Sequence, residues 1–196
     1  IVLGKNPEPH IAILLKYGEN KEKFSTLREL TPEPVKNINV GFIGAGSFAQ
    51  SYLIPNVKSF GASLDTVVTS KGITSKNVAE KFGFNICSAD IKDVLEKKEI
   101  NTVFIATPHS SHASQVVQSL QSHKNVFVEK PLAVSEDELN EIIETKAKNN
   151  LPLMVGFNRR FAPICIELKK EFVNTGEPLV VNIRVNAGFI PKDHWT

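Results

Sequence analysis

The sequence predicts an α/β fold, in which a doubly wound parallel β-sheet is wrapped by helices on both faces. Three observations lead to this prediction. From residue 38 onward, short apolar strand patterns alternate with helical patterns. The first strand breaks into Gly44-Ala45-Gly46-Ser47-Phe48-Ala49 and then continues as a helix. With 196 residues, the chain is long enough for one ordinary core and part of a second.

Three regions are expected along the chain. Residues 1–36 combine one apolar run with a stretch rich in Lys, Glu and Pro, which is typical of a linker. Residues 37–157 carry the alternating pattern, and residues 158–196 are expected to begin a second, α+β domain. Because the sequence opens at Ile1 without a methionine and stops at Thr196 inside a patterned segment, we expect a piece of a longer protein.

Apolar runs and turn residues set the bounds of the expected elements. Strands are expected at 38–43, 64–69, 84–87 (short), 102–107, 125–130 and 151–157. Helices are expected at 47–59, 75–82, 90–97, 111–122 and 135–149. The second domain should open with a helix at about 159–174 and a strand at 179–185.

Local signals support two of these helices and modify a third. Ser135 followed by Glu138 forms a capping box at a helix start. Gly83 suits a helix C-terminal cap with positive φ. Pro55 lies inside the first helix, where its missing backbone donor should kink the helix or shorten its hydrogen-bonded run.

The glycine-rich turn is typical of a dinucleotide-binding, or Rossmann, fold. Gly44 permits the tight turn, Gly46 lets the backbone touch a pyrophosphate, and Ala49 is small enough for the helix to pack on the strand. Phosphates would lie at the helix N-terminus, where unpaired N–H groups favour negative charge. The alternative is a strand-to-helix turn that binds no ligand, and this motif alone does not decide between the two.

Composition excludes several classes of function. With 23 basic and 21 acidic residues, the net charge of +2 is too balanced to indicate nucleic acid or an anionic membrane as a partner. The apolar runs are too short to span a bilayer and the first residues lack a secretory layout, so a cytoplasmic protein is expected. Cys87 and Cys165 lie far apart, so we expect buried free thiols and no metal site.

A second motif, Glu129-Lys130-Pro131, follows an expected strand. The carboxyl end of a strand in such a sheet borders the ligand crevice. A lysine there can bind a ribose or substrate hydroxyl and assist proton transfer, which makes Lys130 the catalytic candidate. The alternative is a surface lysine in an ordinary salt bridge with Glu129.

Four motifs, taken in order, resemble the glucose-fructose oxidoreductase and inositol 2-dehydrogenase family. They are Gly44-Ala45-Gly46-Ser47-Phe48-Ala49, Ala106-Thr107-Pro108-His109-Ser110-Ser111-His112, Glu129-Lys130-Pro131 and Gly156-Phe157-Asn158-Arg159-Arg160-Phe161. The resemblance covers residues 38–161 and implies a Rossmann domain that holds NAD or NADP, followed by an open-faced antiparallel sheet. It also implies hydride transfer between the nicotinamide and a carbinol carbon of a sugar, an inositol or a similar polyol.

The resemblance assigns expected roles residue by residue. The pyrophosphate turn comprises Gly44, Gly46 and Ala49, with backbone amides from Ser47 and Phe48. Other cofactor contacts are expected from Thr107, Pro108, His109, His112, Glu129 and Lys130. His109 stands where the family more often has Asn, and His112 either positions the nicotinamide side or is purely structural. Arg160 matches an arginine at the entry to the second domain, where it either binds substrate or forms a structural ion pair.

Two departures from the family pattern matter. No Asp or Glu follows the second strand, and Ser70 and Lys71 stand where an acid would bind the ribose 2′-hydroxyl of NAD, which slightly favours NADP. The family's catalytic Asp and His have no match here, and His194 stands in the wrong context for that role. The catalytic base is therefore expected beyond Thr196, and this chain should bind cofactor but turn over poorly.

Two further expectations concern partners. Residues 1–17 resemble the end of a medium-chain, alcohol-dehydrogenase-like domain; the alternative is an ordinary apolar strand that covers an edge of the sheet. In either case, the apolar residues 11–15 should pair with a sheet edge or a neighbouring chain. An exposed edge at 179–185 leaves homo-oligomer formation open. The alternatives to a polyol oxidoreductase are a non-catalytic NAD(P)-binding sensor or scaffold and, less favoured by the motifs, a Rossmann domain for S-adenosylmethionine.

Overall fold

The computed structural model describes residues 37–172, together with residues 180–182, 184, 186, 188 and 189. The apolar residues 11–15 and the linker before residue 37 lie outside the described residues, so the predictions for them stay predictions.

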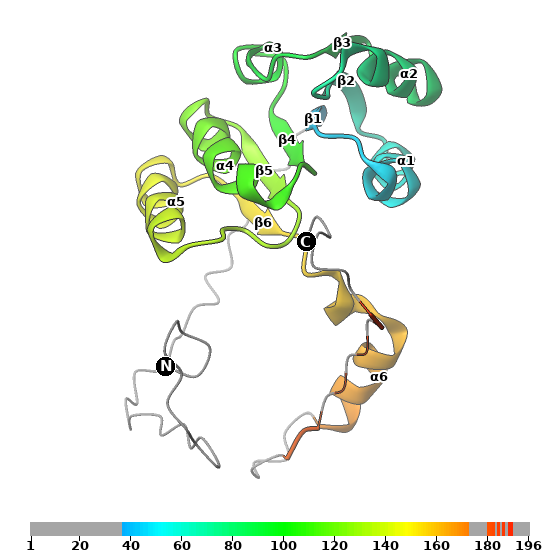
Figure 1. The fold of residues 1–196 in the computed structure, drawn as a ribbon, viewed down its shortest axis with the longest axis vertical. Helices are drawn as coiled ribbons and strands as arrows, with labels where there is room; N and C mark the ends of the chain where they lie inside the picture. The colour runs from blue at the N-terminus through cyan, green and yellow to red at the C-terminus, as the bar shows by residue number, and fades with distance from the viewer. Residues whose placement is uncertain (1–36, 173–179, 183, 185, 187, 190–196) are drawn as a thin grey trace. The chain divides into compact units, whose positions relative to one another are not determined.

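Within the described residues, six parallel strands form one sheet in the order β3-β2-β1-β4-β5-β6 (Figure 1). Their bounds are β1 Asn39–Ile43, β2 Ser63–Val68, β3 Ile86–Ser88, β4 Thr102–Ile105, β5 Asn125–Val128 and β6 Leu153–Val155. From β1 the chain first builds the sheet outward through β2 and β3, then returns to add β4 on the other side of β1. In such sheets the ligand crevice lies outside the carboxyl ends of the strands at this reversal.

Helices connect consecutive strands, and a last helix follows the final strand. They are α1 Ile54–Ser59, α2 Gly72–Phe82, α3 Lys92–Leu95, α4 His112–Gln121, α5 Glu136–Asn149 and α6 Pro163–Glu171. A π-helical turn, Ala49–Leu53, precedes α1, and 3-10 turns at His109–Ser111 and Asn158–Phe161 follow β4 and β6. In Figure 1, α1 and α2 lie on one side of the central strands and α4 and α5 on the other.

Two hydrophobic cores occupy the two faces of the sheet. Neighbouring strand residues point to opposite faces, so Phe42 enters the core under α1 and α2, whereas Ile43 enters the core under α3, α4 and α5. Both side chains are buried, as are Ile54 in the first core and Ile142 in the second. Burial of each such side chain stabilises the fold by about 1.5–3 kcal/mol. The predicted doubly wound parallel sheet is confirmed.

The local signals act as predicted, with one shift. The Glu138 N–H donates to Ser135 Oγ over 3.3 Å, but the Glu138 carboxylate accepts the N–H of Val134, one residue earlier than an ideal capping box. Gly83 ends α2 with φ of 83°. Pro55 lies in the first turn of α1, so the predicted helix at 47–59 divides into the π-helical turn and a shorter α-helix.

Two predictions about secondary structure need correction. The strands end earlier than predicted, β4 at Ile105 and β5 at Val128, because the residues that follow turn away to line the cavities described below. The strand predicted at 179–185 is wrong for the part that the structure describes: residues 180–182 and 184 belong to no strand. Val180 is 93% exposed, and a strand needs partner strands to be stable.

The prediction of buried thiols is also wrong. Cys87 and Cys165 are both free, but Cys87 is exposed and Cys165 is half-buried. Cys87 lies in β3, a three-residue strand at the edge of the sheet, which leaves its side chain in contact with solvent.

Neither a membrane span nor a metal cluster is found in the part of the chain that the structure describes. No described helix is long and apolar enough to cross a membrane. No group of three or more His, Cys, Asp or Glu side chains there is arranged to hold a metal ion.

Candidate functional site

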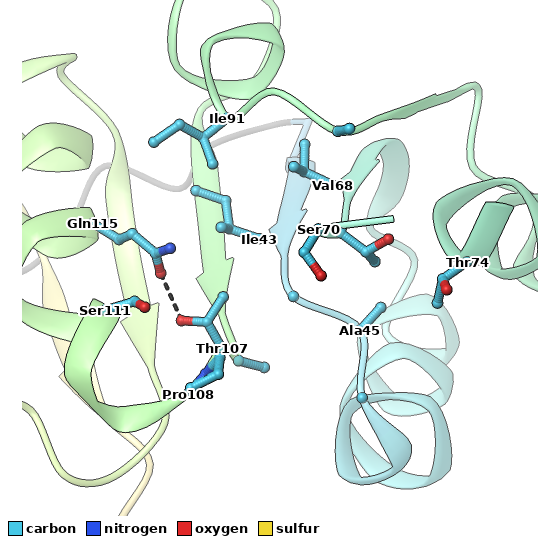
Figure 2. Close-up of a pocket in the computed structure, with 15 residues that line it drawn as sticks. Ile43, Ala45, Val68, Ser70, Thr74, Ile91, Thr107, Pro108, Ser111 and Gln115 are labelled. Carbon is cyan, nitrogen blue, oxygen red and sulfur yellow. Dashed lines mark hydrogen bonds between the residues drawn. The ribbon is translucent and has the colours of Figure 1, made fainter. Parts of the chain in front are cut away.

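Two cavities open at the carboxyl ends of the central strands. The first, of about 640 Å³, reaches the end of β2, and we call it the β2-side cavity (Figure 2). The second, of about 510 Å³, reaches the end of β5, and we call it the β5-side cavity. Gly46, Ala106 and Thr107 line both cavities. The two cavities therefore meet at the sheet reversal, where the fold leaves room for an elongated ligand.

Gly44 is required by the fold itself. Its φ of 88° is a conformation that L side chains rarely adopt, and a Cβ atom there would lie 2.4 Å from the Ala106 carbonyl oxygen. Its N–H donates to the carbonyl of Val68 over 2.8 Å, which ties the turn to the end of β2. Only glycine lets β1 turn this tightly beside β4.

Gly46 has a different explanation. A Cβ atom at this position would meet no other atom within 4 Å, and its φ is not positive. The residue is exposed and lines both cavities. The fold therefore does not require a glycine here, and the space above this backbone position is open to both cavities.

The β2-side cavity is lined by uncharged groups. Ser70 and Thr74 lie on one side of it, and Thr107, Ser111 and Gln115 lie on the other (Figure 2). The Thr107 hydroxyl donates to Gln115 Oε1 over 2.7 Å. None of its lining residues is acidic, so no carboxylate there is placed to receive a ribose hydroxyl.

The β5-side cavity is lined by four titratable side chains: His109, His112, Glu129 and Lys130. Burial raises the pKa of the Glu129 carboxyl, while the Lys130 backbone N–H and the charges of Lys130 and His112 act in the opposite direction. Burial also lowers the pKa of His109, and Lys130 and His112 add to this effect. The β5-side cavity therefore gathers titratable side chains, which the β2-side cavity lacks.

The Glu129 carboxylate lies close to Gly156, the residue after β6. A Cβ atom on Gly156 would lie 2.7 Å from Glu129 Oε1, so the small residue after β6 makes room for the carboxylate. The N–H of Glu129 donates to the carbonyl of Ile105 over 2.9 Å, which continues the pairing of β5 with β4. The Glu129 side chain is half-buried and lines the cavity.

The predicted site residues divide between the two cavities. The β2-side cavity is lined by Gly44, Gly46, Ser70, Thr107 and Pro108. The β5-side cavity is lined by Gly46, Ser47, Phe48, Ala49, Thr107, His109, His112, Glu129 and Lys130. Lys71 and Arg160 line neither. Lys71 is exposed at the N-cap of α2, and Arg160 donates from Nε to the carbonyl of Phe157 over 3.0 Å.

Several lining residues were missed by the sequence reasoning. They are Thr69, Thr74, Ser111 and Gln115 in the β2-side cavity and Asn158 in the β5-side cavity. Gln115 lies three residues after His112 in α4, a spacing that places both on one helix face and was a usable signal. Asn158 belongs to the fourth motif, but nothing in the sequence showed that its side chain would reach the cavity.

The glycine turn, the reversal of strand order and the paired cavities together define a dinucleotide-binding Rossmann domain. The family model described as "Oxidoreductase family, NAD-binding Rossmann fold" matches residues 38–157. The chain belongs to this family of oxidoreductases, as its four motifs predicted.

Curated relatives support the assignment. The scyllo-inositol 2-dehydrogenase (NAD(+)) of Bacillus subtilis strain 168 is 34% identical over 103 residues, which cover 53% of this chain and 30% of the relative. The uncharacterized oxidoreductase YrbE of the same strain is 30% identical over 147 residues, 72% of this chain and 41% of the relative. The chain thus spans about two fifths, or less, of the length of these relatives.

Solved structures show the same fold. Apo scyllo-inositol dehydrogenase from Lactobacillus casei superimposes with a TM-score of 0.65 at 25% identity, over 69% of this chain and 41% of that one. Levoglucosan dehydrogenase in complex with NADH and levoglucosan superimposes with a TM-score of 0.63 at 26% identity, over 69% of this chain and 39% of that one.

Proposed function

We propose that this chain is the cofactor-binding part of an NAD(P)-dependent oxidoreductase that transfers a hydride between the nicotinamide and a carbinol carbon of a sugar-like or cyclic polyol. Gly46 carries the proposal, because the open space above its backbone lies where the two cavities meet. A dinucleotide laid across this point would place one half in each cavity, with its pyrophosphate at the start of the helix.

The uncharged β2-side cavity suits the adenosine half. Ser70 lines it, Thr74 adds a second hydroxyl at the start of α2, and Lys71 is exposed beside them. No lining carboxylate would repel a 2′-phosphate. This lining supports a slight preference for NADP over NAD, in which Ser70 and the long side chain of Lys71 receive the phosphate.

The β5-side cavity suits the nicotinamide half and the reacting carbon. When bound, the nicotinamide accepts or donates the hydride. Lys130 would orient the substrate and polarise its carbinol oxygen, and Glu129 would contact the cofactor ribose. Ser47 and Phe48 would offer backbone amides, and Thr107, Pro108 and His109 would border the ring. Arg160 lies outside both cavities, which favours a structural role for it.

The substrate class comes from similarity. The relatives include an inositol 2-dehydrogenase, and a structural neighbour holds levoglucosan; both names point to polyhydroxylated rings. Residues 158–196 are proposed to open a substrate domain that follows the Rossmann domain. The catalytic Asp and His of the family are proposed to lie in that domain, beyond Thr196.

Hydride transfer can be tested with NADP⁺ or NAD⁺ and a panel of cyclic polyols, by following the absorbance of the reduced nicotinamide. The proposal predicts tight binding with slow turnover in this chain, because proton removal by a positioned base contributes about 10²- to 10⁴-fold. Loss of the residual rate in Lys130→Met, but not in the exposed-site control Lys98→Met, would support the enzyme. Equal rates in Lys130→Met and the parent chain would favour a non-catalytic NAD(P) sensor or scaffold instead.

A further inference from the structure

His112 is buried, with 0% of its surface exposed, and lies at the first position of α4. Both of its ring nitrogens face backbone carbonyl oxygens. Nδ1 lies 2.6 Å from the carbonyl oxygen of Pro131, and Nε2 lies 2.9 Å from the carbonyl oxygen of Thr107. The Nε2 distance is typical of an N–H···O hydrogen bond, and the Nδ1 distance is slightly shorter than usual.

A neutral imidazole does not satisfy this arrangement. It carries one N–H donor and one nitrogen lone pair, whereas a carbonyl oxygen only accepts. In either neutral tautomer, the lone pair of one ring nitrogen would point at a carbonyl oxygen less than 3 Å away, and the two atoms would repel each other. Only the imidazolium, which has an N–H on both nitrogens, donates to both oxygens at once.

We infer that His112 is held as an imidazolium cation that donates to Thr107 and Pro131, and so joins the turn after β4 to the turn after β5. The two carbonyls belong to residues in or next to the motifs that line the β5-side cavity. Through them, His112 is a positioning residue that sets the separation of Thr107 and Lys130.

The charges around the ring are compatible with a buried cation. Three titratable groups line the same cavity: Glu129 at the end of β5, Lys130 in the turn that follows, and His109 in the 3-10 turn. The ionised Glu129 favours the imidazolium, whereas the burial of the ring, the charge of Lys130 and the N-terminal end of α4 oppose it. The two carbonyl dipoles offset that opposition, because charge-assisted hydrogen bonds are about twice as strong as neutral ones.

The protonation state of His112 stands apart from any ligand, but its role in positioning Lys130 rests on the proposed function. Long-range ¹H–¹⁵N NMR of the ¹⁵N-histidine-labelled chain tests the first part without cofactor. At about pH 7.5, where an exposed histidine in a peptide is mostly neutral, both ring nitrogens of His112 should show the shifts of protonated nitrogens. The signal is assigned through its own backbone, so no variant has to fold. One unprotonated ring nitrogen in His112 would overturn the inference.

The second part is tested by titrating NADPH into His112→Gln, which offers a single amide group in place of two opposed N–H donors. The matched control is His123→Asn, an exposed site with φ of 57° that asparagine tolerates. We expect the dissociation constant to rise about fivefold or more in His112→Gln, with backbone amide shifts at Thr107, His109, Glu129 and Lys130. Unchanged affinity and unchanged shifts in a folded His112→Gln would overturn the positioning role. If the parent chain binds no dinucleotide, the proposed function fails, while the NMR result still decides the protonation state.

Discussion

The two cavities differ in what their walls offer a ligand. The β2-side cavity is lined by hydroxyls, an amide, backbone and apolar groups, and none of its lining residues is charged. The β5-side cavity has Glu129, Lys130 and two histidines in its wall. We propose that the first cavity holds part of the cofactor and that the second also serves proton transfer. Gly46 lies in the wall of both, so the proposed binding and the proposed chemistry meet at this backbone position.

The largest effect on stability is expected at Gly44, which the fold requires. Gly46, in the same turn, is proposed to serve binding and should tolerate a side chain. Gly44→Ala puts a Cβ 2.4 Å from the Ala106 carbonyl at a φ of 88°, so we expect it to destabilise the chain by about 3 kcal/mol or more. Gly46→Ala meets no atom within 4 Å and should change stability by about 1 kcal/mol or less. Urea unfolding measures both. Equal destabilisation by the two substitutions would break the distinction between them.

The next effect tests the uncharged character of the β2-side cavity. Ser70→Asp introduces a carboxylate into its wall, which should repel a 2′-phosphate and accept the 2′-hydroxyl of NAD. We expect the ratio of NADPH to NADH affinity to fall by about ten- to a hundredfold. Ser63→Asp adds the same charge at the opposite end of β2 and serves as the control. If both substitutions change the ratio alike, the effect is only one of net charge.

A smaller effect is expected in the β5-side cavity, because Lys130 is proposed to serve chemistry more than affinity. Lys130→Met should weaken cofactor binding by about three- to tenfold, the equivalent of one hydrogen bond. Isothermal titration of Lys130→Met against the exposed control Lys98→Met measures the difference. A loss as large as that of a substitution at Gly46 would show that the charged wall also dominates binding.

The smallest effect is a dependence of stability on pH. Burial raises the pKa of Glu129 in the folded chain, so the folded state keeps this proton over a pH range in which the unfolded chain has lost it. Stability should therefore fall as pH rises from the ordinary carboxyl range to the raised value. Glu129→Gln removes this dependence. The stability of the variant relative to the parent chain should therefore increase as pH rises from the ordinary carboxyl range to the raised pKa. Thermal unfolding beside the exposed control Glu144→Gln checks the sign; an advantage that shrinks with pH would contradict it.

Local sequence signals predicted most of the fold. The Gly44 turn, the capping box at Ser135 and the positive φ of Gly83 each depend on residues within one turn of the chain. The structure confirms the first and the third, and it confirms the Ser135 half of the capping box. Burial in an edge strand depends on the sheet as a whole. The exposure of Cys87 was therefore not predictable from its apolar neighbours.

Site residues could be predicted where a motif directly follows a strand. Contacts between turns that are far apart in the sequence could not be predicted. Glu129 and Lys130 were named because they follow β5, and both line a cavity. Ser70 and Lys71 were named together, but only Ser70 lines a cavity, because the chain turns into α2 at Lys71. The two carbonyl partners of His112 lie five and nineteen residues away, and no local pattern places them on opposite sides of one ring.

We propose that one dinucleotide spans both cavities across Gly46. The most direct measurement is a fluorescence titration of the purified chain with NADH and NADPH, beside Gly46→Val, whose side chain would fill the space above the backbone. We expect micromolar binding with a slight preference for NADPH, and we expect this binding to be lost in a Gly46→Val chain that unfolds at the same urea concentration as the parent. Undiminished binding in a folded Gly46→Val, or no binding of either nucleotide by the parent chain, would contradict this proposal.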